Sequence, residues 1–273
     1  MKRKRGAKSG KGRKEKWERV EKRMPKKPKV SKGKKSRSRE VEASKAGKGQ
    51  RKTLRLERIS SGIPKFDELI GKGFLRDTVN LIVGGAGSGK TIFATQFLVD
   101  GAKIGEPGIL VTFEEKKNRF YADMKGLGWD LEDLEKKKKF ALIEYTPEQV
   151  KKMLEEGGGE IEVVIENIKA KRLVIDSISS FALLFETDLE KREAALSLFE
   201  LLKKWKVTAL LTLEQEPTIG MTAEHIASPL EFEVDGIILL YFVRPDGTRI
   251  REVEILKMRG TKHSKKVYEF DIE

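Results

Sequence analysis

The segment that most constrains the fold of this chain spans Gly84 to Thr91 and reads Gly-Gly-Ala-Gly-Ser-Gly-Lys-Thr. It fits the G-x-x-x-x-G-K-[ST] pattern of a phosphate-binding loop, or P-loop. An apolar run at residues 79–83 precedes it and predicts a buried strand, and residues 91–103 are patterned as a helix. This strand–loop–helix order is the context that the motif requires, so the sequence predicts binding of a nucleoside triphosphate.

The residue types of the P-loop explain how it would hold phosphate. Glycines let the backbone pass close to the β-phosphate, and the first amides of the following helix point toward the anion. We expect Lys90 to reach the β- and γ-phosphates and the Thr91 hydroxyl to bind Mg²⁺. The predicted nucleotide-binding residues are Gly84, Gly85, Ala86, Gly87, Ser88, Gly89, Lys90, Thr91 and Ile92.

An acidic residue ends the apolar run at residues 173–175. This residue, Asp176, completes a Walker B pattern, in which a carboxylate at a strand end holds Mg²⁺ beside the P-loop threonine. A strand-end acid also commonly caps the helix that follows it. With a P-loop upstream we favour the magnesium role, so Thr91 and Asp176 form the predicted metal site.

Two further acids, Glu114 and Glu115, follow the apolar run at residues 109–113. Strand ends on the carboxyl edge of a parallel sheet face the ligand crevice. A carboxylate there can take a proton from the water that attacks the γ-phosphate. Since neighbouring residues of a regular strand point to opposite faces, we expect Glu114 to be the base and Glu115 a helper or the partner of a cation. The predicted catalytic residues are thus Glu114, Glu115 and Lys90.

The rest of the chain after residue 53 alternates strand and helix patterns. A short helix is expected at residues 64–70, with Pro64 near its start. Further strands are expected at 140–143 and 207–213, and helices at 161–171 and 188–205. Such alternation predicts an α/β fold, a mostly parallel sheet covered by helices on both faces. Residues 236–243, 250–258 and 266–272 read as strands without intervening helices, which predicts antiparallel strands at the C-terminal end.

The charge of the chain, +14 overall, is distributed unevenly. Residues 1–55 hold 25 Lys and Arg residues and five Glu residues, a balance of +20, and the remainder has a balance of −6. Residues 1–53 are rich in Lys, Arg, Gly and Ser, so we expect a basic disordered tail, with residues 54–273 forming the ordered domain. Basic tails bind polyanions by releasing counterions, and residues 1–52 are therefore predicted to bind nucleic acid. A solvated appendage, docking on the acidic domain and binding to an anionic membrane surface remain alternatives.

Composition excludes several classes of protein. The chain has no cysteine, so it contains no disulfide, thiolate metal site or cysteine nucleophile. No stretch approaches the roughly 20 apolar residues of a membrane helix, and the basic N-terminus lacks the apolar core of a secretory signal. We therefore expect a cytoplasmic protein.

Several segments together resemble the KaiC branch of the RecA-family ATPases. The resemblance covers residues 56–273 and rests on the P-loop and on the segments Ser61–Ile70, Val111–Glu115, Gly128–Leu131, Leu173–Ser177 and Val253–His263. The last of these contains a K-x-R-G-T-x-H element. The resemblance implies a RecA-like P-loop NTPase core in which ATP and Mg²⁺ bind and ATP is hydrolysed.

The resemblance also implies a ring, commonly a hexamer, with a nucleotide at each subunit junction. Glu114 and Glu115 match the paired catalytic glutamates of the family. Lys257 and Arg259 match positions that reach the γ-phosphate held by the neighbouring subunit. Thr261 and His263 match nearby nucleotide contacts, and Met258 belongs to the same element. Lys257 and Arg259 stand at i and i+2 of an extended segment, where side chains project to one side.

The chain departs from the family in two respects. KaiC carries two such domains and this chain carries one, and the basic tail lies outside the resemblance. No N-K-x-D motif is present, so we expect ATP rather than GTP. The favoured function is a Mg²⁺-dependent ATPase acting with nucleic acid as an accessory of DNA repair or recombination. The alternatives are a regulatory ATPase that gates a protein partner, a nucleic-acid-binding module with a vestigial ATPase, and a kinase.

Overall fold

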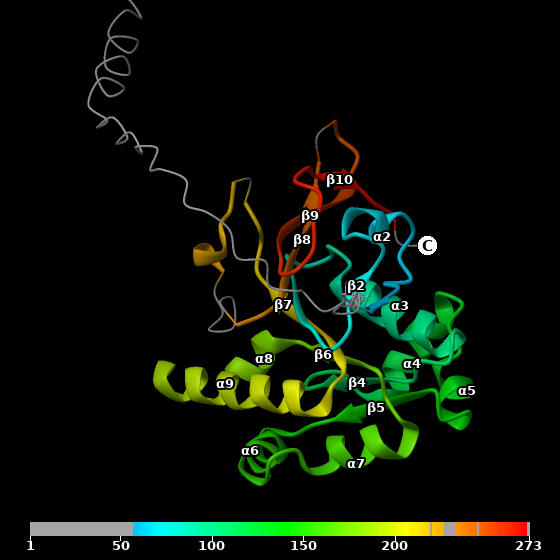
Figure 1. Ribbon diagram of the computed structural model, residues 1–273, viewed down its shortest axis with the longest axis vertical. Coiled ribbons are helices and arrows are strands. Elements are labelled where there is room, and N and C mark those ends of the chain that lie inside the picture. The colour runs from blue at the N-terminus through cyan, green and yellow to red at the C-terminus, as the bar shows by residue number, and fades with distance from the viewer. Residues whose placement is uncertain (1–56, 219, 227–232, 245, 272–273) are drawn as a thin grey trace, which may run out of the picture. The chain divides into compact units, whose positions relative to one another are not determined.

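The computed structural model describes residues 57–218, 220–226, 233–244 and 246–271 (Figure 1). The predicted basic tail, residues 1–53, lies outside the described residues. In the described part, one sheet has the strand order β10-β9-β8-β3-β7-β6-β4-β5. Its strands are β3 (Val79–Gly84), β4 (Gly108–Thr112), β5 (Phe140–Glu144), β6 (Arg172–Asp176), β7 (Thr208–Glu214), β8 (Gly236–Val243), β9 (Ile250–Met258) and β10 (Tyr268–Glu269).

The strands from β3 to β8 are mutually parallel. At one edge of the sheet, β9 runs antiparallel to β8, and β10 runs antiparallel to β9. This confirms the mostly parallel sheet with antiparallel strands at its C-terminal end. The parallel strands are short, almost continuously buried apolar runs, as expected when helices cover both faces. A separate two-stranded ladder, β1 (Arg58–Ile59) with β2 (Phe74–Leu75), was not predicted.

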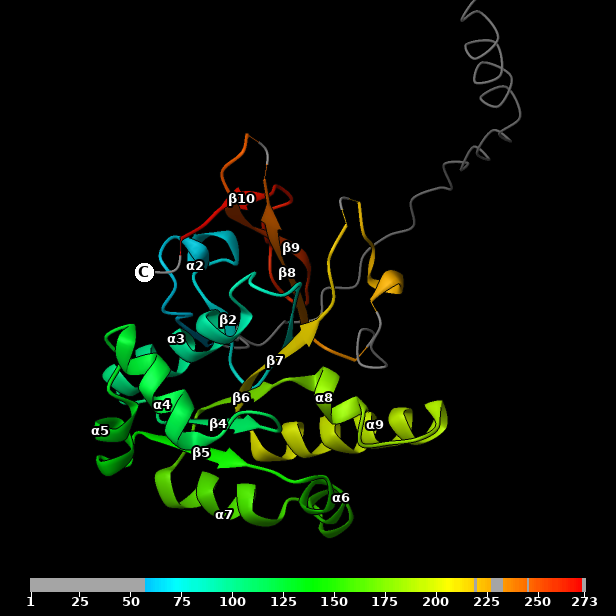
Figure 2. The ribbon, with the colours of Figure 1, turned by 180° about the vertical axis from the view of Figure 1, so that it is seen from behind.

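Helices cover both faces of the sheet (Figures 1 and 2). One core joins α6 (Pro147–Glu156), α7 (Gly159–Ile168), α8 (Ile178–Ala182) and α9 (Asp188–Trp205) to one face. The other core joins α2 (Phe66–Leu69), α3 (Lys90–Lys103), α4 (Lys117–Gly126) and α5 (Leu131–Lys136) to the opposite face. Among the described residues, none of the helices is long and apolar enough to cross a bilayer.

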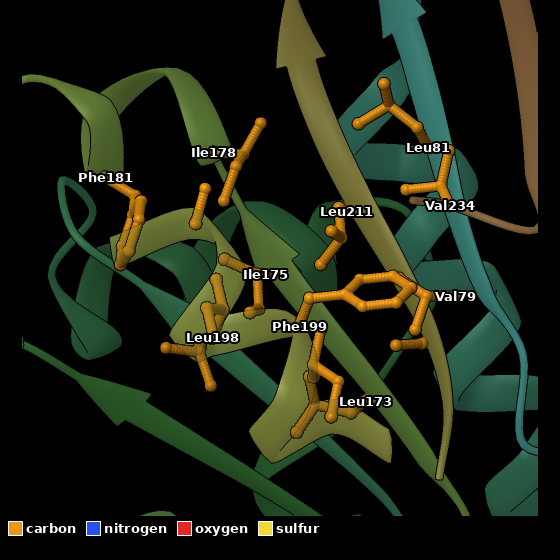
Figure 3. Close-up of a cluster of buried hydrophobic side chains, with 14 of the residues drawn as sticks. Val79, Leu81, Leu173, Ile175, Ile178, Phe181, Leu198, Phe199, Leu211 and Val234 are labelled. Carbon is orange, nitrogen blue, oxygen red and sulfur yellow. The ribbon is translucent and has the colours of Figure 1, made fainter. Parts of the chain in front are cut away.

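The strands divide their side chains between the two cores by alternation. Leu173 and Ile175 of β6 enter the first core, and Val174 between them enters the second. Figure 3 shows part of the first core, in which α9 presents Leu198 and Phe199 to these strands. The helix expected at residues 188–205 is confirmed as α9.

Two predicted helices differ at their ends. The helix expected at 64–70 begins only at Phe66, because Lys65 has a left-handed φ of 63° and Pro64 precedes the helix. The helix expected at 161–171 begins at Gly159 and ends at Ile168, where Lys169 turns left-handed with a φ of 55°. The helices α4, α5, α6 and α8 were not predicted.

Candidate nucleotide-binding and catalytic site

The P-loop joins the carboxyl end of β3 to the amino end of α3, as the motif requires. Its turn uses glycine freedom at two positions, because Gly87 and Gly89 have φ values of 77° and 97°. The amide of Ser88 donates to the Gly85 carbonyl at 3.3 Å, which closes the loop. The Lys90 ammonium donates to the same carbonyl at 2.9 Å. The loop therefore holds the Lys90 ammonium at the place where the phosphates of a nucleotide would lie.

The predicted metal site joins the first turn of α3 to the end of β6. The Thr91 hydroxyl donates to Asp176 Oδ2 at 2.7 Å, which brings the start of α3 to the end of β6. A third group, the buried Thr212 hydroxyl on β7, donates to the other oxygen of Asp176. A hydroxyl and a carboxylate are the oxygen donors that suit Mg²⁺. The residues present therefore fit the ion that the P-loop implies, with Thr212 orienting the carboxylate.

Both predicted catalytic glutamates border the same cleft. A cleft of about 120 Å³ is lined by Lys90, Thr91, Thr112, Glu114, Glu115, Asp176, Ser177 and Glu214. Strand alternation does not separate the two glutamates, because β4 ends at Thr112 and both lie in the bend that follows. The Thr112 hydroxyl accepts hydrogen bonds from both their amides, at 3.4 and 3.2 Å. The argument from alternation that ranked Glu114 above Glu115 therefore does not hold.

A different contact distinguishes the glutamates. Glu114 Oε1 accepts a hydrogen bond from the Ser180 hydroxyl of α8. Burial raises the pKa of the Glu115 carboxyl, and the neighbouring charges of Asp176 and Asp123 raise it further. Glu114 is thus fixed by a donor, and Glu115 is the carboxylate whose charge the site disfavours.

The environment also acts on the lysine of the P-loop. Burial lowers the pKa of the Lys90 ammonium, and the carboxylates of Glu214, Asp176 and Glu216 oppose this shift. A phosphate group would supply further negative charge at the same place. Three acids therefore act on the lysine that is predicted to bind the phosphates.

Sequence reasoning missed two acids at the end of β7, Glu214 and Glu216. Glu214 lines the cleft, and Glu216 lies so close to Gly85 that a Cβ added there would sit 1.6 Å from its carboxylate. The Gln215 amide donates to the Gly84 carbonyl at 3.1 Å. A signal was present, because an apolar strand ending in Glu-Gln-Glu has the same form as the strand ends that were singled out. The missing information was that β3 and β7 are neighbours in the sheet.

The K-x-R-G-T-x-H element begins at the end of β9, which lies two strands from β3 and pairs there with the start of β8. Lys257 pairs with Ile237, which pairs with Leu81, whereas the P-loop begins after Gly84. Three residues along a strand and two strand spacings put the Lys257 backbone on the order of 14 Å from Gly84. Arg259 lies farther from it. Neither cation therefore reaches the P-loop of its own chain.

The residues of this element have partners near the end of β9. Arg259 donates to the Glu233 carbonyl at 3.2 Å and lies 3.7 Å from the Asp235 carboxylate. Because β9 ends at Met258 and Arg259 lies beyond it, regular strand alternation does not fix the side to which Arg259 projects. Met258 is buried in the second core.

The last two residues of the element contact neighbouring segments. Thr261 accepts a hydrogen bond from Arg58 at 3.0 Å, and His263 Nδ1 lies 2.7 Å from the Ser264 carbonyl. The five residues of this element that the sequence singled out therefore lie apart from Glu114, Glu115 and Asp176.

Comparisons with known proteins identify the family of this chain. The family model described as "ATPase: KaiC" matches residues 59–273. The circadian clock protein KaiC3 of Synechocystis is 34% identical over 224 residues, which are 80% of this chain and 44% of that protein. A UPF0273 protein of Aeropyrum pernix is 33% identical over 231 residues, which are 80% of this chain and 91% of the relative. The chain thus spans less than half of the clock protein and nearly all of the shorter relative.

A solved structure supports the same assignment. The crystal structure of a KaiC-like protein of the hyperthermophilic archaeon Pyrococcus horikoshii OT3 superposes with a TM-score of 0.70 at 41% sequence identity. The match covers 80% of this chain and 96% of that one. The family model, the relatives and the fold agree with one another, and the chain belongs to the KaiC family of ATPases.

Proposed function

We propose that the protein hydrolyses ATP to ADP and phosphate with Mg²⁺ at the cleft beside the P-loop. The observation that supports this most directly is the convergence of four groups from three strand ends. Lys90 and Thr91 follow β3, Glu114 follows β4 and Asp176 ends β6, and all four border one cleft. A P-loop alone requires only the first two groups, whereas hydrolysis requires the other two.

In the proposed reaction each side chain has one role. The P-loop amides and Lys90 bind the phosphates, and Thr91 and Asp176 hold Mg²⁺, which when bound neutralises charge on the β- and γ-phosphates. A water oxygen forms a bond to the γ-phosphorus while the bond to the bridging oxygen of ADP breaks. Glu114 accepts the proton that this water releases. Glu115, whose pKa is raised by burial and by nearby acids, lines the same cleft and is proposed as a helper of this base.

The test compares Glu114→Gln with Glu115→Gln. Glutamine keeps the size of each side chain and removes its basicity. We expect Glu114→Gln to lower kcat by at least about 100-fold, the usual contribution of a general base, with ATP binding retained. Glu115→Gln is expected to lower it less. The assignment of the base is wrong if Glu115→Gln abolishes turnover and Glu114→Gln does not.

We further propose that the subunits form a closed ring, in which Lys257 and Arg259 of one subunit complete the site of its neighbour. Their position near the start of β8, away from the P-loop of their own chain, supports a head-to-tail contact, in which one surface of a copy meets a different surface of the next. A cation pair at that junction would stabilise the charge of the transition state as an arginine finger does.

Mixing two inactive variants tests the shared site. One variant carries Lys90→Ala, and the other carries Lys257→Ala and Arg259→Ala. In randomly mixed rings some junctions combine an intact P-loop with intact cations, and at equal amounts these are about a quarter of all junctions. We expect about that share of the wild-type rate. If the cations act within their own chain, the mixture stays inactive.

We also propose that residues 1–52 bring nucleic acid to the ATPase, in a role accessory to DNA repair or recombination. The charge balance of +20 over residues 1–55 supports this. Deleting residues 1–52 is expected to remove most affinity for single-stranded DNA or RNA and to flatten its dependence on salt. In the full chain, nucleic acid is expected to raise ATP turnover. An unchanged rate with retained binding would favour a regulatory ATPase that gates a protein partner.

A further inference from the structure

The short helix α8 begins directly after two residues that line the cleft, Asp176 and Ser177. It follows β6 directly, and β6 stands between β7 and β4 in the sheet. The hydroxyl of Ser179 accepts a hydrogen bond from the Glu214 amide at 2.8 Å, at the end of β7. The hydroxyl of Ser180 contacts Glu114, after the end of β4. One helix thus contacts the chain at both neighbouring strand ends through successive serines.

The hydrogen bonds around Ser180 have a determined direction. A serine hydroxyl has one hydrogen to donate, and an ionised carboxylate only accepts. Ser180 therefore donates to Glu114 Oε1 and accepts from the Ser177 hydroxyl, whose oxygen lies 2.9 Å away. The Ser177 oxygen in turn accepts from the Ser180 amide at 3.3 Å. The two serines form a short relay whose last donor acts on Glu114.

We infer that Ser180 is a positioning residue for the catalytic base, which it holds by donating to one carboxylate oxygen of Glu114. This inference rests on the proposed ATPase function. Ser180 is 8% exposed, so water competes little for its hydroxyl. With one oxygen of Glu114 fixed, the other is free to accept a proton from a water in the cleft. Hydrogen bonds to charged groups are stronger than neutral ones, so this contact restricts the orientation of the carboxylate.

The charged groups around the cleft do not replace this donor. Among the described residues that line it, the charged groups besides Glu114 are Lys90, Glu115, Asp176 and Glu214. Three of these are acids and cannot donate to a carboxylate when ionised. The fourth, Lys90, donates to the Gly85 carbonyl and stands where phosphate is expected. Ser180 is therefore the donor placed to orient Glu114.

The experiment measures kcat and KM for ATP in Ser180→Ala, Ser180→Thr and the double variant with Glu114→Gln. We expect Ser180→Ala to lower kcat about tenfold and to leave KM and ATP affinity within about twofold, because the base and not the phosphate cradle is affected. Threonine keeps the hydroxyl and is expected to restore most of the rate. In the Glu114→Gln background, Ser180→Ala is expected to have no further effect.

Ser197→Ala on α9 is the matched control, since Ser197 lines a different cavity with Lys151 and Phe185. Its kcat should equal that of the wild type. If Ser180→Ala unfolds the protein, Ser180→Cys keeps the volume with a much weaker donor and takes its place. The inference is overturned if the variant turns over like the wild type while Glu114→Gln is inactive, or if the two effects multiply in the double variant. If Glu114→Gln itself retains wild-type turnover, the proposed base has failed instead.

Discussion

Replacing Glu106 with glutamine is expected to lower the free energy of unfolding by about 3 kcal/mol. The reason is Arg172, whose side chain is fully buried at the start of β6. Its guanidinium donates to Glu106 Oε2 at 3.0 and 2.6 Å and to the Phe97 carbonyl at 2.6 Å, and it stacks on the Phe97 ring. Without the Glu106 charge, a buried cation is left with the Asp100 carboxylate at 3.8 Å as its nearest counter-ion in the described chain.

The magnitude follows from this geometry. Removing one partner of a buried ion pair costs about 3–5 kcal/mol, and glutamine retains an acceptor oxygen, which places the effect at the lower end. For a domain of this size, about 3 kcal/mol corresponds to a fall in the melting temperature of roughly 6–12 °C. Thermal and urea unfolding followed by circular dichroism would measure both quantities.

Glu57 provides the matched control, because Arg76 pairs with both Glu57 and Glu106. The Glu57 side chain is 77% exposed, whereas that of Glu106 is 14% exposed. Glu57→Gln is expected to cost less than about 1 kcal/mol, as exposed ion pairs do. The double variant Arg172→Met with Glu106→Gln should be more stable than the sum of the single effects predicts. Equal, small losses for Glu57→Gln and Glu106→Gln would refute the reasoning.

Three further outcomes are expected. In urea titrations, the difference in the free energy of unfolding between the wild type and Glu106→Gln should be full at pH 7. It should shrink as the pH falls below about 4.3. Burial alone would raise the pKa of Glu106, but hydrogen bonds from Arg172 and Arg76 lower it, so this stability is lost only as the carboxylate is protonated. Gly101→Ala should lower the melting temperature, although alanine favours helices, because its Cβ would lie 2.4 Å from Arg172 Cδ. Thr212→Val should raise the Mg²⁺ concentration for half-maximal turnover about tenfold, since Asp176 loses a donor that orients it; an unchanged Mg²⁺ requirement would contradict that role.

Local patterns were sufficient to predict the elements that carry the chemistry. The P-loop and the Asp176 strand end were predicted because each is one continuous segment in which buried apolar residues precede a polar turn. The extents of β8, β9 and α9 were predicted for the same reason, from apolar runs and from one apolar helical face. By contrast, α4 and α5 are polar helices with few buried residues, so their apolar periodicity is weak.

The arrangement of the site depends on strand order, which no local pattern encodes. The chain runs from β3 to β4, yet β7 and β6 lie between them in the sheet. That order brings Glu214, from far along the chain, to the side of the P-loop and puts α8 between two strand ends. Strand-end acids could therefore be predicted one at a time, but their neighbours could not. Ser180, which has no motif of its own, gains its proposed role only because β6 is next to β4.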